Sequence, residues 1–274
     1  MRRAPAIAVA AVLLLAVASL ARADGEAPRI DIIGAPRTEA IDAIASILTR
    51  DLGLSLPART RVHVYTSREA FRRGIVTDGD LAEDGADELA AFAVGLARPG
   101  RVLINARLAE VGTEWQRLLA HELMHVVQFE LAGGEGRAEQ WLAEGVAEHV
   151  AFQVLERLGV GSVARHRSVA RTRVPRQVAF AQARLDLATL GSPREFTLRH
   201  QREGSLETYH LTFLLADHLI QRDGLGKVME YFARLRRQPS AKAFAATFGQ
   251  TLQQFEVEAL ARLQATTAPA PASP

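Results

Sequence analysis

His121, Glu122 and His125 form the pattern His-Glu-x-x-His, in which two imidazoles surround a carboxylate at helical spacing. Residues four apart lie on one face of a helix, so His121 and His125 can bind one metal ion together. The neighbouring Glu122 can then act as general base toward a water molecule that the metal activates. The pattern predicts metal-assisted hydrolysis; the alternative is a surface helix that carries two solvated histidines.

The residues around this pattern are typical of a helix from Thr113 to Leu131. Thr113 and Gln116 have the spacing of a capping box, in which each side chain satisfies a backbone N–H of the first turn. Apolar residues follow at helical spacing, and Gly133 and Gly134 are a stop signal. The two histidines are therefore expected on the same helix.

Glu144 is the candidate for a third ligand, because a catalytic zinc needs three protein ligands and an open position. Eighteen residues separate it from His125. A helix end, a glycine-rich turn and a second helix from about Arg137 to Leu158 fit in that interval. If the second helix runs antiparallel to the first, it brings Glu144 to the two histidines. The expected ion is Zn²⁺, one per chain, although such a site also accepts Co²⁺ or Mn²⁺.

Glu148 lies four residues after Glu144, on the same face of the second helix. A histidine that binds zinc usually donates its other ring N–H to a carboxylate or a carbonyl. We therefore predict that Glu148 accepts a hydrogen bond from His121. The alternative is an ordinary exposed glutamate.

Together, His-Glu-x-x-His, the interval of eighteen residues and Trp-Leu-x-Glu-Gly-x-Ala-Glu resemble the gluzincin branch of zinc metallopeptidases. More narrowly, they resemble bacterial secreted peptidase MA-like metallohydrolases. The resemblance covers approximately residues 62–263, and its specific motifs lie in 115–149 and 204–224. It implies an α+β, zincin-like fold and carries over these roles: metal ligands His121, His125 and Glu144, and general base Glu122.

The Trp-Leu-x-Glu-Gly run also resembles the third-ligand segment of zinc aminopeptidases. Ala143, however, stands where those enzymes and thermolysin have Asn, so that side-chain contact is absent. The chain also has no motif similar to Gly-x-Met-Glu-Asn. These departures argue against an aminopeptidase of that kind.

A third helix is expected from Ser205 to Arg222, with Tyr209 near its start. In gluzincins a Tyr or His stabilises the oxyanion of the tetrahedral intermediate, and the resemblance implies this role for Tyr209. His210 is the substitute candidate. A core tyrosine with a bonded hydroxyl is an equally good interpretation of Tyr209.

The remaining patterns predict a small mixed sheet in an N-terminal lobe (24–132) and a mainly helical C-terminal lobe (133–264), with the metal between them. A hairpin before the metal helix is a candidate edge strand, to which an extended peptide can add; a plain structural hairpin is the alternative. The expected elements are a strand at 29–34, a helix at 37–52, a strand at 62–65, a short helix at 67–73, a solvated loop at 74–88, hairpin strands at 91–97 and 101–105, and closing helices at 227–237 and 240–263.

Residues 1–23 have the basic start, the apolar run and the Ala-Arg-Ala site of a signal peptide, so we expect an exported, periplasmic or extracellular protein with no stable membrane span. The whole sequence has 33 basic and 31 acidic residues. Removal of three arginines with the signal peptide leaves a net charge near −1, which does not favour nucleic-acid binding. The chain has no cysteine, which excludes disulfides, thiol catalysis and thiolate ligands.

Two further segments have distinct compositions. Residues 161–205 are rich in arginine, which predicts either a solvated helical face or a surface for an anionic partner. Residues 265–274 are rich in Ala, Pro, Thr and Ser, and a disordered tail is expected there.

The sequence thus favours zinc-dependent hydrolysis of a polypeptide substrate. The alternatives are a non-catalytic zinc module that binds an envelope partner, and a hydrolase of non-peptide amides. The sequence indicates no oligomeric state.

Overall fold

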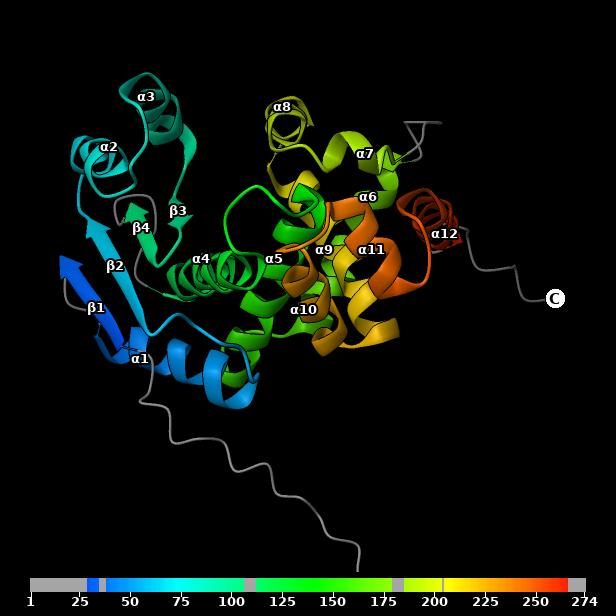
Figure 1. Cartoon of the computed structure of the whole chain (residues 1–274), viewed down its shortest axis with the longest axis horizontal. Helices are drawn as coiled ribbons and strands as arrows, with labels where there is room; N and C mark the ends of the chain where they lie inside the picture. Colours follow the sequence, from blue (N-terminus) through cyan, green and yellow to red (C-terminus); the bar gives the residue numbers. More distant parts are fainter. Residues whose placement is uncertain (1–28, 35–37, 106–111, 179–184, 204, 266–274) are drawn as a thin grey trace, which may run out of the picture.

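The computed structural model describes residues 29–34, 38–105, 112–178, 185–203 and 205–265 (Figure 1). The chain is a mixed α/β protein in which helices predominate. A small sheet with three short helices lies at one side, and a larger group of helices lies at the other. No helix of the described part is long and apolar enough to cross a membrane. The expected signal peptide and residues 266–274 of the expected tail lie outside the described residues.

The sheet is mixed, as predicted, and its strand order is β1-β2-β4-β3. β1, β2 and β4 are parallel, whereas β3 pairs antiparallel with β4 and forms one edge. The predicted hairpin therefore does supply an edge strand, and it precedes the helix that carries His121 and His125. The strands are β1 (Arg29–Gly34), β2 (Arg59–Tyr65), β3 (Gly95–Arg98) and β4 (Arg101–Asn105).

The N-terminal helices correct two predictions. Residues 74–88 are not a loop, because α2 continues to Thr77 and α3 begins at Glu83. Their apolar side chains form a small core against Leu103 of the sheet, which favours helix despite the acidic composition. The first hairpin strand is shorter than predicted, because α3 continues through Phe92. The helices are α1 (Thr38–Ser46), which continues as a π-helical turn (Ile47–Asp51), α2 (Arg68–Thr77) and α3 (Glu83–Phe92).

The two central helices are α4 (Thr113–Ala132) and α5 (Gln140–Arg157). The capping box predicted at the start of α4 was wrong: Gly112 precedes the first turn, and its carbonyl accepts the N–H of Gln116 at 3.1 Å. The predicted stop is confirmed, because Gly133 ends α4 in the left-handed conformation (φ 73°) that glycine adopts without steric cost. α5 begins three residues later than predicted.

α5 packs mainly against α4 and α9, and α6, α7 and α8 also contact it (Figure 1). One hydrophobic core is continuous from α1 to α12, and within it Trp141 of α5 stacks on Phe255 of α12. The arginine-rich stretch is distributed mainly over α6 and α8. The helices after α5 are α6 (Val163–Val178), α7 (Leu187–Leu190), α8 (Pro193–Glu203), α9 (Ser205–Asp223), α10 (Leu225–Arg234), α11 (Ser240–Phe248) and α12 (Leu252–Ala265).

Candidate metal centre

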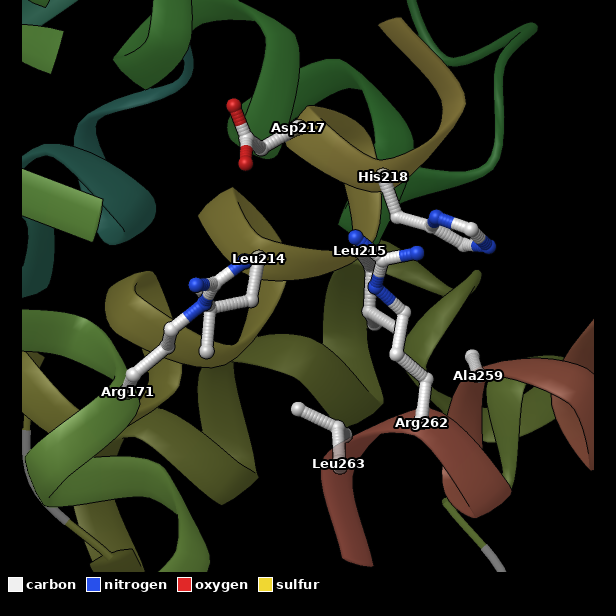
Figure 2. A pocket seen from close by; sticks show the side chains of 8 residues that line it. All are labelled: Arg171, Leu214, Leu215, Asp217, His218, Ala259, Arg262 and Leu263. Carbon is white, nitrogen blue, oxygen red and sulfur yellow. The ribbon is translucent and has the colours of Figure 1, made fainter. Parts of the chain in front are cut away.

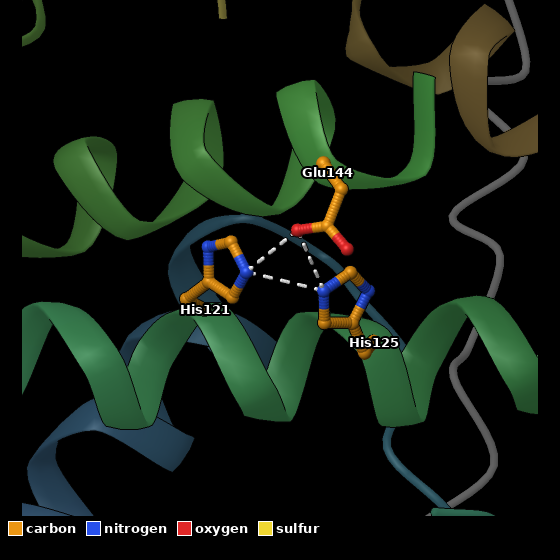
Figure 3. A group of neighbouring side chains, drawn as sticks. All are labelled: His121, His125 and Glu144. Atoms are coloured by element: carbon orange, nitrogen blue, oxygen red, sulfur yellow. Dashed lines mark hydrogen bonds and ion pairs between the residues drawn. The ribbon is translucent and has the colours of Figure 1, made fainter. Parts of the chain in front are cut away.

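The structure brings His121, His125 and Glu144 together between α4 and α5 (Figure 3). The Nε2 atoms of the two histidines are 3.1 Å apart. Glu144 Oε2 lies 3.2 Å from His121 Nε2 and 3.5 Å from His125 Nε2. All three residues are buried, and no other group of three His, Asp or Glu side chains within the described residues could hold a metal ion.

These distances fit a single small cation. Ligand atoms that bind tetrahedral zinc at about 2.0–2.1 Å lie about 3.3 Å from one another. The three observed separations scatter around that value. Two imidazoles and one carboxylate are also the ligand set of a class of catalytic zinc sites, in which a fourth position stays open. The donor set and its spacing therefore fit a zinc ion.

Glu122 lies between this group and the sheet edge. It is buried and accepts a backbone hydrogen bond from Ala97 of β3. Burial raises the pKa of its carboxyl group, and the nearby imidazoles of His121 and His125 oppose that shift. Glu122 is thus held beside the ligands in an environment that makes its carboxylate a better proton acceptor.

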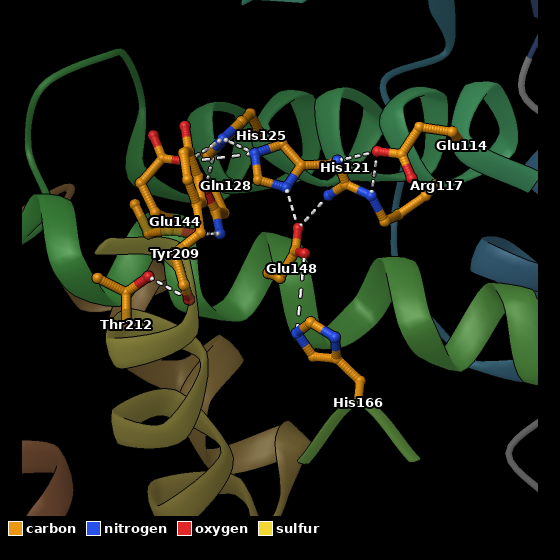
Figure 4. Close-up of polar contacts among 11 residues, drawn as sticks. Glu114, Arg117, His121, His125, Gln128, Glu144, Glu148, His166, Tyr209 and Thr212 are labelled. Atoms are coloured by element: carbon orange, nitrogen blue, oxygen red, sulfur yellow. Dashed lines mark hydrogen bonds and ion pairs between the residues drawn. The ribbon is translucent and has the colours of Figure 1, made fainter. Parts of the chain in front are cut away.

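On the far side of the candidate ligands, Glu148 contacts the second ring nitrogen of His121, and Arg117 contacts Glu148 (Figure 4). Glu148 Oε2 lies 3.2 Å from His121 Nδ1, so Glu148 is the partner of this ring nitrogen. The same oxygen accepts a hydrogen bond from Arg117 Nη1 at 2.5 Å. A carboxylate in this place fixes the ring of His121 with Nε2 toward the metal position.

Two glutamines were missed from the sequence. Gln128 Oε1 is 2.8 Å from His125 Nδ1, and Gln128 Nε2 donates to the carbonyl of Ala143 at 2.9 Å. Gln140 Nε2 donates to Glu144 Oε1 at 2.7 Å. Each glutamine stands three or four residues from its ligand along a helix, and that spacing is the signal that could have identified it. Gln128 also links α4 to α5 immediately before the third ligand.

The charges of the site favour bound cations. Burial raises the pKa of Glu144, but the charge of His125 and hydrogen bonds with both histidines reverse the effect and hold that pKa well below its usual range. Burial likewise opposes ionisation of Glu148, yet Arg117 and His121 lower its pKa to about 2. Both carboxylates are therefore ionised at neutral pH.

Tyr209 lies on α9 beside the ligands. Its ring centre is 5.9 Å from that of His121, in an edge-on arrangement. Burial raises the pKa of its hydroxyl, which stays protonated and can donate a hydrogen bond. His210, the substitute candidate, is buried with its ring centre 5.2 Å from that of His166, and it is not among the side chains that line the cleft.

A cleft of about 530 Å³ opens over the metal site. α4 contributes His121, Glu122 and His125 to it, and the sheet edge lies opposite α5 across it. A second cavity, between α6, α9 and α12, has only about 20 Å³ and contains none of the ligands (Figure 2). Further residues that line the large cleft are Leu89, Gly95, Leu96, Ala97, Gln128, Phe129, Glu135, Arg137, Gln140, Glu144, Pro193, Tyr209 and Phe232.

Comparison with known proteins adds no assignment. No protein-family model matches the sequence, and no curated protein matches it. The geometry and chemistry of this site are therefore what indicates a function.

Proposed function

We propose that the chain is a zinc-dependent peptidase of the gluzincin type, with a zincin-like fold and its metal site between the two lobes. The observation that carries this proposal is the group of three ligand atoms 3.1–3.5 Å apart with Glu122 beside it in the cleft. A purely structural metal site has no need of such a base or of an open approach. The signal peptide expected at 1–23 would make it an exported enzyme.

The ligand set defines the chemistry. A zinc ion held by His121, His125 and Glu144 would lower the pKa of a water toward about 7 and polarise a carbonyl oxygen. Glu122 would accept the proton of the attacking water on its carboxylate and pass it to the leaving amine. Burial raises the pKa of Glu122, so the protonated form that holds the proton between the two transfers is stabilised.

Tyr209 would stabilise the negative charge that develops on the carbonyl oxygen. Its side chain lines the cleft, and no hydrogen bond from its hydroxyl is found within the described residues. An O–H group that is not engaged elsewhere can donate to an oxyanion at no cost of breaking another bond. This placement favours the catalytic interpretation of Tyr209 over the core interpretation.

The edge strand β3 would bind the substrate backbone. Val94 O accepts the N–H of Asn105 at 2.8 Å, so Val94 faces β4. Because successive residues of a strand alternate in direction, the backbone groups of Gly95 and Ala97 face away from β4. The N–H of Ala97 already donates to Glu122, so the other backbone groups would bind a peptide. Both residues line the cleft. An extended peptide could therefore add to β3 beside Glu122.

The test is metal content and cleavage of casein or mixed peptides, measured on purified residues 24–274 and on Glu122→Gln. We expect one zinc per chain in both proteins and cleavage in the unmodified protein alone. Cleavage that persists in metal-loaded Glu122→Gln would contradict the mechanism. A metal-loaded protein that cleaves no peptide would contradict the proposed activity.

A further inference from the structure

Side chains from α4 and α5 alternate along the metal site in a single ladder (Figure 4). His125 and His121 of α4 flank Glu144 of α5, with separations of 3.5 and 3.2 Å from Glu144 Oε2. Glu148 of α5 follows, 3.2 Å from His121. Arg117 of α4 is the last member, 2.5 Å from Glu148. Arg117 thus stands one helical turn before the first ligand and contacts it only through Glu148.

We infer that Arg117 is a positioning residue of the metal centre, which fixes Glu148 and through it the ring of His121. This inference rests on the proposed metal site and adds a residue that the motif does not contain. Arg117 Nη1 and His121 Nδ1 converge on the same oxygen, Glu148 Oε2. While that oxygen is held by Arg117, His121 directs Nδ1 toward it and Nε2 toward Glu144.

A competing contact makes the role of Arg117 necessary. His166 of α6 approaches Glu148 from the side opposite the metal site, with Nε2 at 3.9 Å from Glu148 Oε1. This ring nitrogen is buried and has no hydrogen-bond partner among the described residues. The carboxylate of Glu148 is itself only 6% exposed, so water cannot replace a lost partner. Without Arg117, Glu148 can turn toward His166 and release His121.

The edge of the Arg117 guanidinium that does not contact Glu148 is bound by Glu114. Arg117 Nε and Nη2 donate to Glu114 Oε1 at 2.8 and 2.5 Å. The carboxylate of Glu114 is 69% exposed, so water can satisfy Arg117 if this contact is lost. The planar guanidinium reaches both carboxylates at once, which a lysine ammonium on a single stem cannot reproduce. Glu114 is therefore the matched control for Glu148.

The test is zinc affinity, measured by competition with a chelator for Arg117→Met, Glu148→Gln and the double variant. We expect each single substitution to weaken zinc binding by about 10- to 100-fold, the usual effect of losing a group that orients a ligand. The double variant should bind zinc no more weakly than Glu148→Gln, because Arg117 acts through Glu148. Glu114→Gln should change the affinity by less than about threefold, since that contact is exposed.

A purely structural role predicts a different result. In that case the unfolding midpoint of metal-free Arg117→Met falls, but the zinc affinity of the folded protein and its Co²⁺ absorption spectrum stay unchanged; this result would overturn the inference. Independent, additive losses in the double variant would overturn it too. If Arg117→Met does not fold, Arg117→Lys is the substitute test. We expect this variant to bind zinc about 3- to 10-fold more weakly than the unmodified protein, and an unchanged zinc affinity would refute the inference.

The same measurements separate this inference from the proposed function. Zinc affinity does not depend on turnover. If zinc affinity depends on Arg117 and Glu148 as expected but the protein cleaves no peptide, only the peptidase proposal is refuted. An unmodified protein that binds no zinc refutes both.

Discussion

Gly95 lies directly against the carboxylate of Glu122, so closely that a Cβ at residue 95 would be 2.6 Å from Oε1 and 2.8 Å from Cγ. The backbone of Gly95 is not in the left-handed region, so alanine is compatible with its conformation. Glycine is therefore required at this position because a Cβ does not fit, and not because of the backbone conformation. The edge strand thus leaves just enough room for the side chain of Glu122.

Replacing Gly95 with alanine should displace Glu122 and leave the metal ligands in place. We expect Gly95→Ala to keep its zinc and to lose at least about 100-fold in kcat/KM, because a shift near 1 Å in a reacting group has effects of that size. The control is Gly85→Ala on α3, where an added Cβ meets no atom within 4 Å. Full activity in metal-loaded Gly95→Ala would show that Glu122 is not fixed by the strand.

Tyr209→Phe removes only the hydroxyl from the cleft. If this group stabilises the oxyanion, kcat should fall by about 10²- to 10³-fold with little change in KM or zinc content. Tyr65→Phe is the matched control: its hydroxyl donates to Asp78 Oδ2 at 2.6 Å, away from the cleft. That variant should lose about 1–2 kcal/mol of stability and no activity. Equal kcat values for Tyr209→Phe and the unmodified protein would show that the hydroxyl of Tyr209 has no catalytic role and that its ring only packs.

Gly145, which follows Glu144, is explained by a helix crossing. A Cβ at Gly145 would lie 2.1 Å from the carbonyl oxygen of Thr212 on α9, and a backbone atom cannot turn aside. Gly145→Ala should therefore push α9 from α5 and lower the free energy of unfolding by about 1–3 kcal/mol in urea titrations. Gly226→Ala, with open space around its Cβ, should not. Equal stabilities would show that this crossing adapts without strain.

Part of the candidate metal site could be predicted from sequence, because helical periodicity places His121 with His125 and Glu144 with Glu148. Only the packing of α4 on α5 brings the two pairs together. His121 and His125 share a helical face by their spacing, and Glu148 follows Glu144 by one turn. The edge strand was also predicted, since it forms a hairpin with its neighbour in sequence. These features depend on contacts between residues that are close in the sequence, or on the pairing of two consecutive helices.

What was missed depends on contacts between elements. Gln128 and Gln140 have helical spacing to their ligands, but glutamine is common on helix surfaces, and only the packing of α4 on α5 shows that these two are turned inward. Arg117 acquires its role from Glu148, 31 residues away. The sequence predicts a loop at 74–88, where the structure has the end of α2 and the first part of α3, because charged residues there outnumber the few apolar ones that bury against the sheet.

Beneath the site, Asp217 of α9 joins three helices through its carboxylate, which is 4% exposed. Arg167 of α6 donates to both of its oxygens at 2.6 and 2.8 Å, and His149 of α5 lies 3.2 Å away. Burial alone raises the pKa of Asp217, but the hydrogen bonds from Arg167 and the nearby imidazole of His149 lower it from 3.8 to about 2. The ionised form is thus favoured in the folded protein.

Because the folded pKa of Asp217 is below the unfolded one, its contribution to stability is complete above pH 4 and is lost as the pH falls toward 2. This contribution amounts to about 2 kcal/mol. The free energy of unfolding in urea should therefore fall between pH 5 and pH 2 in both proteins. In Asp217→Asn this fall should be smaller than in the unmodified protein by that amount. Asp87→Asn, which removes a pair with Arg72 whose carboxylate is 69% exposed, should change the profile much less. Identical profiles for Asp217→Asn and the unmodified protein would mean that the buried pair does not control acid stability.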